Sequence, residues 1–241
     1  IERKQLYPLF IRKKGFCKAI LIHTYGPNGI KATPPNIVNY INKETILKNI
    51  HSAQAVRPDA IIACMHWGEE YQSLPNREQR ELADWLLEQG VTHIIGSHPH
   101  VIQPMELRED GNQQHAVVYS LGNFISNMSA ANTDGGLIFT LQLEKYPLPS
   151  PIHPLQGRLS YSPLPDSFIP SFPFSRVAQC GYTLVWTARP TLTGGKNYIL
   201  YPSYSPIDQL PQAARNRLNI FTKNSRKFLF KHNTGVCENS K

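Results

Sequence analysis

Three histidines have the residue type and the spacing for metal chemistry. His66 follows the apolar run at 60–65, and His98 and His100 follow a second short strand expected at 91–95. The apolar run is typical of a buried strand in a parallel sheet, and the carboxyl ends of neighbouring parallel strands meet at one edge. We therefore expect the three imidazoles to converge there as metal ligands and catalytic groups. Imidazole suits zinc, iron, manganese or nickel, so these residue types alone do not choose the ion.

The pair formed by His98 and His100 is the stronger signal. In an extended segment, residues two apart point to the same side, so both rings can meet one or two metals. Pro99 stiffens the segment, and Gly96 removes side-chain bulk where the loop leaves the strand. For His66 alone, a ligand role and a structural role are equally favoured. The pair at a second strand end favours the metal site.

Other polar residues near these histidines have open roles. Glu69 and Glu70 are either ligands or general bases, or a solvated loop face. In the loop at 119–124, Ser120 has no Asp partner and Asn123 no nearby histidine base, so a serine nucleophile is not expected. That loop is expected to shape the pocket or to donate hydrogen bonds, although Gly-Asn is also an ordinary turn.

The remaining pattern supplies the elements that must position these residues. Apolar runs at 6–11 and 19–25, joined by a basic Gly-containing turn, predict a β-hairpin. One helix is expected at 43–56, and another begins at its cap Asn76, with Gln79 in capping-box position, and ends at Gly90. Further expected elements are strands at 116–121 and 137–143, edge strands at 181–187 and 198–201, and a helix at 209–231. A strand–helix–strand order around the helix after Asn76 predicts parallel pairing.

Composition excludes several classes of protein. The chain has 241 residues, 41% hydrophobic, enough for a sizeable core in one or two domains. No run approaches the roughly 20 apolar residues of a membrane span. The net charge is +8, but residues 1–20 and 208–241 each carry +5 while residues 57–145 carry −7. Basic chain ends without a nucleic-acid-binding motif do not favour a nucleic-acid partner.

Three motifs together carry a family resemblance. Residues 65–71 (MHWGEEY), 96–104 (GSHPHVIQP) and 119–124 (YSLGNF) resemble, in this order, the capsule-synthesis CapA family of poly-γ-glutamate biosynthesis proteins. That family shares the calcineurin-like metallophosphoesterase fold. The resemblance runs from about residue 6 to residue 143. It implies an α/β protein, a metallophosphoesterase-like layered α/β sandwich of which this chain supplies the C-terminal half.

The resemblance also implies roles for the histidines. His66 matches the isolated histidine ligand, and His98 and His100 match the paired-histidine motif, here Gly-Ser-His-Pro-His. The isolated histidine and the first of the pair would bind one divalent metal, and the second of the pair another. Manganese, iron and zinc are the candidate ions.

The acidic Gly-Asp and Asn-His motifs of the family do not occur in this sequence. We therefore expect about half of the site to be absent and the chain alone to be inactive. The expected organisation is residues 1–146 as the C-terminal part of the CapA-like domain, a Pro-rich linker or excursion at 147–175, and an extension at 176–241 with late strands and a basic helix.

Two functions follow from the resemblance. In the first, the whole protein is a metal-dependent hydrolase of a phosphoester or related bond. In the second, it is a non-catalytic envelope component that assists the synthesis or export of an anionic polymer. The expected partners are an anionic polymer or a phosphorylated small molecule, together with envelope synthesis machinery. The resemblance points to the cell envelope or periplasm.

Overall fold

A six-stranded sheet forms the half of the molecule that bears the histidines. The computed structural model describes all residues except 1–6, 27–28, 31, 112, 146–174 and 240–241. The strands of this sheet are β1 (Leu9–Lys13), β2 (Phe16–Thr24), β3 (Ala60–His66), β4 (His93–Ser97), β5 (Met105–Asp110) and β6 (Gln113–Val118). Their order is β1-β2-β3-β4-β6-β5. The central strands β2, β3, β4 and β6 are parallel, and the outer strands β1 and β5 pair antiparallel.

Two helices make the crossovers between the parallel strands. α1 (Lys43–Gln54) connects β2 to β3, and α2 (Arg77–Glu88) connects β3 to β4. Their apolar residues pack on one face of the sheet and form a core that includes Leu21, Ile50 and Leu86. At the start of α2 the Asn76 side chain accepts a hydrogen bond from the Gln79 backbone N–H. The Gln79 side chain in turn accepts one from the Asn76 backbone N–H. The capping box predicted from the sequence is confirmed.

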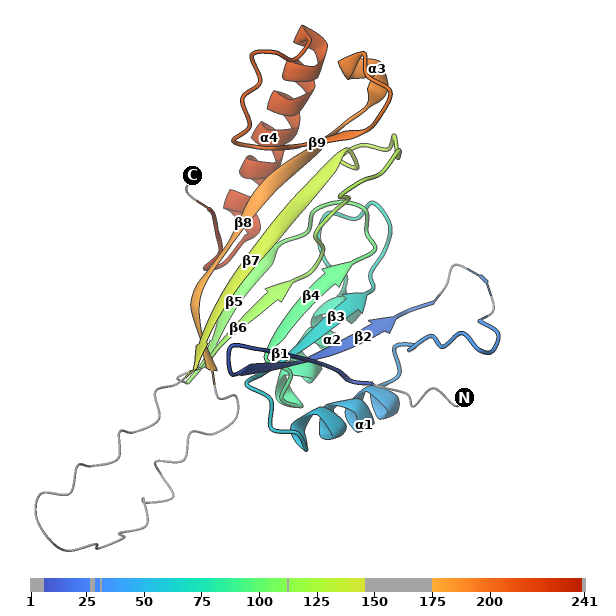
Figure 1. Cartoon of the computed structure of the whole chain (residues 1–241), viewed down its shortest axis with the longest axis vertical. Helices are drawn as coiled ribbons and strands as arrows, with labels where there is room; N and C mark the ends of the chain where they lie inside the picture. The colour runs from blue at the N-terminus through green and yellow to red at the C-terminus, as the bar shows by residue number, and fades with distance from the viewer. Residues whose placement is uncertain (1–6, 27–28, 31, 112, 146–174, 240–241) are drawn as a thin grey trace, which may run out of the picture.

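A second sheet extends across the molecule beside the first (Figure 1). It contains β7 (Gly135–Lys145), β8 (Ser175–Ala188), β9 (Ile199–Pro202) and β10 (Cys237–Glu238). The long strand β8 pairs with the other three. The short helix α3 (Pro190–Thr193) follows β8, and α4 (Gln212–His232) packs against this sheet. A second core joins Trp186 of β8 and Leu218 of α4 to Val118 of β6.

The face of the first sheet opposite the helices bears exposed apolar side chains at the β1–β2 end. Ala19 and Leu21 are fully buried beneath the helices, so the alternating residue Ile22 points to the other face. Leu9 of β1 pairs with Ile20 and lies on that face too. Leu9, Ile11 and Ile22 are 47%, 42% and 53% exposed. One face of this sheet is therefore covered along its length, and the other is open at one end.

The structure confirms the layered α/β class and most of the expected elements. The predicted hairpin, the parallel pairing of β3 with β4, and the helices α1, α2 and α4 are all present. Strand β5 was not predicted. Strand β8 is not an edge strand, contrary to expectation, because β7 and β10 flank it. It was misread because only its last part is a continuous apolar run.

The predicted Pro-rich linker lies almost entirely outside the described residues. β7 and β8 pair from Gly135–Trp186 to Lys145–Ser175, which places both sides of that segment in one sheet. The division of the chain into three parts stays a prediction.

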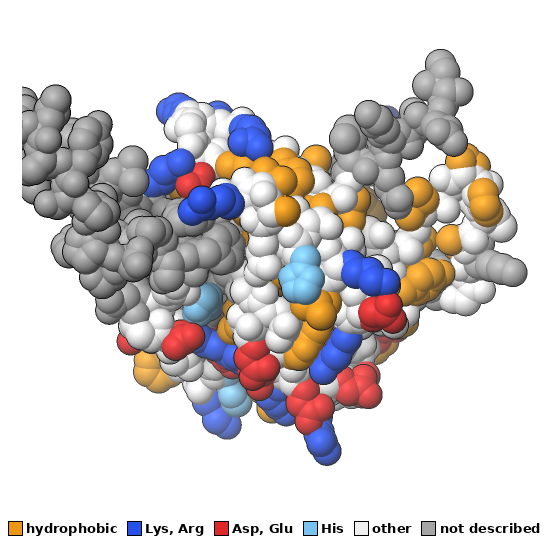
Figure 2. Space-filling model, turned by 90° about the horizontal axis from the view of Figure 1, so that it is seen from below, with side chains coloured by type: hydrophobic (Ala, Val, Ile, Leu, Met, Phe, Trp, Pro, Cys, Tyr) orange, Lys and Arg blue, Asp and Glu red, His pale blue; other side chains and the backbone are white. Residues whose placement is uncertain are grey.

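Charges on the molecular surface are mixed at the α1 end. Seen from below, acidic and basic side chains lie side by side there with hydrophobic side chains between them (Figure 2). On α1 itself, Lys48 pairs with Glu44 at 2.7 Å. Among the described helices, none is long and apolar enough to cross a membrane.

Candidate metal centre

The histidines lie where two neighbouring parallel strands end. His66 is the last residue of β3 and pairs in register with Ser97, the last residue of β4. The chain then passes through His98 and His100. The sequence interpretation of an extended segment is wrong here, because both residues have positive φ, 105° and 61°. Such backbone is strained for a residue with a side chain and is concentrated at functional sites. The two rings are nevertheless brought together, with centroids 5.9 Å apart.

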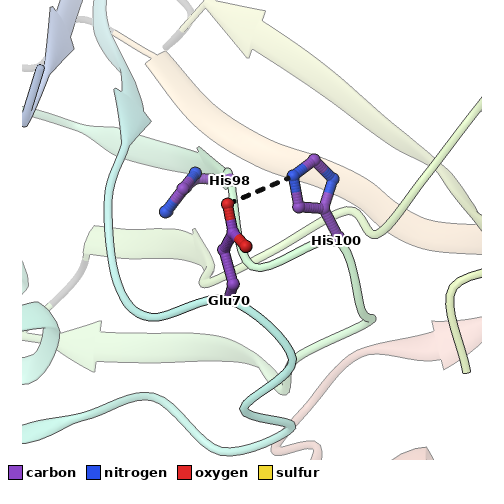
Figure 3. A group of neighbouring side chains, drawn as sticks. All are labelled: Glu70, His98 and His100. Carbon is purple, nitrogen blue, oxygen red and sulfur yellow. Dashed lines mark ion pairs between the residues drawn. The ribbon is translucent and has the colours of Figure 1, made fainter. Parts of the chain in front are cut away.

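Glu70 joins the paired histidines. One ligand atom from each of Glu70, His98 and His100 lies within 4.8 Å of the others, so this cluster can hold a metal ion. His100 Nε2 is 4.0 Å from Glu70 Oε1, and the carboxylate points into the space between the two rings (Figure 3). The structure thus distinguishes the two glutamates, because only Glu70 lies in the cluster with the paired histidines. Glu69 instead accepts a hydrogen bond from Asn76 Nδ2 at the start of α2.

His66 lies beside this cluster. Its ring centroid is 4.6 Å from that of His98, and its Nδ1 is 3.4 Å from Ser97 Oγ. It is not part of the tight group formed by Glu70, His98 and His100. The structure thus brings all three predicted histidines into one place. Their roles as metal ligands and catalytic groups stay predictions.

The surroundings of His66 and His98 favour the neutral form of their imidazoles. Burial lowers the pKa of His66, and the neighbouring His100 lowers it further. Burial also lowers the pKa of His98, as do the nearby His66 and His100 rings, while the Glu70 carboxylate acts in the opposite direction. A neutral imidazole keeps a lone pair on one ring nitrogen, which a metal ligand requires.

Asn123, from the loop after β6, fixes the tautomer of His100. Its Nδ2 donates to the Thr133 carbonyl oxygen at 2.9 Å, which turns its Oδ1 toward His100 Nδ1 at the same distance. An amide oxygen only accepts, so Nδ1 carries the proton. The lone pair of His100 is then on Nε2, the atom that faces Glu70. An outer partner of this kind orients a metal ligand.

Tyr25 is a residue of this site that the sequence analysis did not identify. It follows β2, the strand next to β3, and its backbone N–H donates to the His66 carbonyl oxygen at 3.0 Å. Its ring is parallel to that of His66 at 5.7 Å and lies 4.5 Å from that of His98. Its place at the end of a third parallel strand was the available signal.

The backbone beneath the site is tightly packed. Trp67 Nε1 donates to the Tyr119 carbonyl oxygen at 2.9 Å across Gly96. A Cβ atom on Gly96 would lie 2.0 Å from that oxygen and 2.5 Å from Trp67 Nε1. Gly96 is therefore required because β4 and the end of β6 approach too closely for any side chain.

Comparison with known proteins finds a family model that matches the part of the chain carrying this site. The family model described as "Bacterial capsule synthesis protein PGA_cap" matches residues 18–128. That range contains Tyr25, His66, Glu70, the paired histidines and Asn123, and it ends before β7.

Two curated relatives match part of the chain. The "Capsule biosynthesis protein CapA" of Bacillus anthracis is 33% identical over 102 residues, which cover 41% of this chain and 24% of that protein. The "PGA biosynthesis protein CapA" of Bacillus subtilis (strain 168) is 34% identical over 87 residues, 36% of this chain and 22% of that protein. The chain therefore matches about a quarter of the length of these relatives. Residues 18–128, which carry the whole candidate metal centre, are therefore similar to the CapA family of bacterial capsule synthesis proteins.

Proposed function

We propose that the whole protein acts in the biosynthesis of a capsule or of poly-γ-glutamate as a metal-dependent hydrolase of a phosphoester or related bond. The observation that carries the proposal is the meeting of Glu70, His98 and His100 at the carboxyl ends of parallel strands. The names of both relatives support the biological role in this proposal. Their length, about four times the matched stretch, is the reason for proposing the activity for the whole protein.

The donor set fits a divalent metal. Two imidazoles and one carboxylate are the ligand types of zinc, iron and manganese sites. The amide of Asn123 holds His100 with Nε2 free for an ion. A metal bound there would act as a Lewis acid on a phosphoryl oxygen. His66 and Tyr25 border the ligands and would orient the bound group and exclude water from one side.

Metal uptake by the 241-residue chain tests the site. We expect calorimetric titration with Mn²⁺ or Zn²⁺ to give at least tenfold weaker binding for His98→Gln and for His100→Gln. The matched control is His51→Gln, because His51 is exposed on α1 away from the site. Elemental analysis after dialysis gives the stoichiometry. Unchanged metal content in both site variants would contradict the proposal.

A second candidate function is non-catalytic assistance with an anionic polymer. The relatives' names refer to polymer biosynthesis, and the net charge of +8 favours a polyanion. Metal-dependent turnover of an aryl phosphate by the whole protein supports the hydrolase. Salt-sensitive binding of the polymer without turnover supports the alternative.

A further inference from the structure

A groove lies beside the candidate metal centre, along α4. Its volume is about 450 Å³. The helix contributes a row of residues from Arg217 to His232, and the opposite wall contains Ser73, Val101, Asn132 and Asp134. Nothing in the proposed chemistry at the histidines uses this groove.

The groove is lined in part by the loops that carry the metal centre. Ser73 belongs to the loop that carries Glu70, three residues away, and Val101 directly follows His100. Asn132 and Asp134 flank Thr133, whose carbonyl oxygen accepts the Asn123 hydrogen bond that orients His100. The metal centre and the groove are therefore neighbours along these loops.

The groove carries excess positive charge. Asp134 is the one acidic residue in its described lining, and it is already paired with Arg217 at 2.6 Å and with Trp186 Nε1 at 3.1 Å. Lys227 and Lys231 form no ion pair with any described acidic side chain. Arg226 on the same helix differs, because it is paired with Glu238.

The two lysines lie on the same side of the helix. Residues four apart on a helix are neighbours, and two like charges there repel each other. An anion between them would remove this repulsion. Phe221 and Val101 also line the groove and are 6% and 1% exposed, so part of the lining is apolar. The groove lining thus combines apolar side chains with two ammonium groups that have no ion-pair partner among the described residues.

We propose that this groove is a second binding subsite for the substrate of the metal centre. Its ligand is the part of the substrate that does not react, an extended carbon or phosphate chain with at least two negative groups. The proposal rests on the proposed function for the reacting end of that substrate. Binding of an anion in the groove itself needs no metal.

The test uses the 241-residue chain after removal of metal with EDTA. Tripolyphosphate and tricarballylate serve as probes, because each has several negative groups, on a phosphate and on a carbon chain respectively. Calorimetric titration compares the chain with the double variant Lys227→Gln/Lys231→Gln. The control is Lys196→Gln/Lys223→Gln, which loses the same charge at exposed positions outside the groove.

We expect the groove variant to bind at least one probe about tenfold more weakly and the control to change less than twofold. The probe that binds more tightly distinguishes a phosphate ligand from a carboxylate ligand. Equal weakening in both double variants would show that net charge alone attracts the anion and would overturn the proposal. Absence of binding to the unmodified chain would overturn it too. Both lysines are exposed, so thermal unfolding is expected to be unchanged.

The two proposals fail separately. If His98→Gln loses metal but binds the probe normally, both stand. If the unmodified chain takes up no metal but binds the probe in the groove, the metal centre is wrong and the groove remains an anion site.

Discussion

Two hydrogen bonds of the Asn123 side chain allow a positioning role to be tested separately from a structural one. Its Oδ1 holds His100, and its Nδ2 holds the Thr133 carbonyl oxygen. An aspartate in its place keeps an acceptor for His100 Nδ1 but loses the donor to Thr133. An alanine loses both.

We therefore expect Asn123→Ala to weaken Mn²⁺ binding about tenfold, the lower end of the usual effect of removing an outer partner. Asn123→Asp is expected to bind Mn²⁺ nearly as well as the unmodified chain. Both variants should unfold at lower temperature, because the buried Thr133 carbonyl loses its partner. Calorimetric titration and thermal unfolding measure the two effects. Equal loss of Mn²⁺ affinity in both variants would show that the His100 contact does not position the ligand.

At the scale of elements, the side chains on the two faces of strand β2 differ in burial. Leu21 is fully buried under the helices and its neighbour Ile22 is 53% exposed. We expect Leu21→Ala to lower the free energy of unfolding by about 2–5 kcal/mol, through lost burial and the cavity it leaves. Ile22→Ala, the matched control, should cost less than about 1 kcal/mol. Denaturant titration measures both. A large loss at Ile22 would mean that this face is covered in solution.

The contact between α4 and β10 depends on pH. Glu238 accepts two hydrogen bonds from Arg226, at 2.7 and 2.8 Å, and one from Ser203. The Arg226 hydrogen bond lowers the pKa of Glu238 below its ordinary value of 4.5. The stability it gives is complete above pH 4.5 and is lost as the pH falls through the lower pKa of the folded state.

Glu238→Gln is therefore expected to lower the free energy of unfolding by about 1 kcal/mol at pH 7, since the pair is bidentate but partly exposed. Near pH 2 the variant and the unmodified chain should differ much less. Glu44→Gln, in an exposed pair on α1, should have a smaller effect at either pH. Denaturant titration at the two pH values checks this. An effect of Glu238→Gln that does not change with pH would contradict the ionic origin.

The sequence predicted the elements whose local signals agree with their final environment. The capping box at Asn76 and the apolar run of β3 are such cases. Strand β5 was missed because its residues 106–110 are mostly charged, and its place is set by pairing with β6. The histidines were found from strand ends. Their actual approach depends on two positive φ values, which a sequence of non-glycine residues does not indicate.

Glu70 and Tyr25 show why the rest of the site could not be derived from the sequence. Glu69 and Glu70 are identical in type, and only the turn after β3 decides which carboxylate faces the histidines. Tyr25 reaches the site through the pairing of β2 with β3, a contact between segments about 40 residues apart. Such contacts depend on tertiary packing rather than on local pattern.

For the whole molecule, the pairing of β7 with β8 brings two distant parts of the chain together. Lys145 and Ser175 are register partners although 30 positions separate them. Paired residues of this kind can be joined by a two-residue turn, and Asn-Gly is the preferred sequence. The fold of the described residues therefore does not need the length of the segment at 146–174.

We expect a variant with Asn-Gly in place of residues 146–174 to fold, and to be more stable by up to about 2 kcal/mol because the loop it closes is shorter. The same deletion joined by Pro-Pro is the control, since it lacks the donors and the positive φ of a hairpin turn. Thermal unfolding and Mn²⁺ titration compare the variants. Loss of folding with Asn-Gly would show that the segment contributes to the core.

Because Lys145 and Ser175 are adjacent, this end of the β7–β8 pair also suits the insertion of another domain. An inserted domain or fluorescent reporter whose own ends lie close together would connect there without shifting the β7–β8 register. β7 begins two residues after Thr133, whose carbonyl oxygen accepts a hydrogen bond from Asn123. Such a reporter would therefore be attached to the strand pair whose other end adjoins the metal centre.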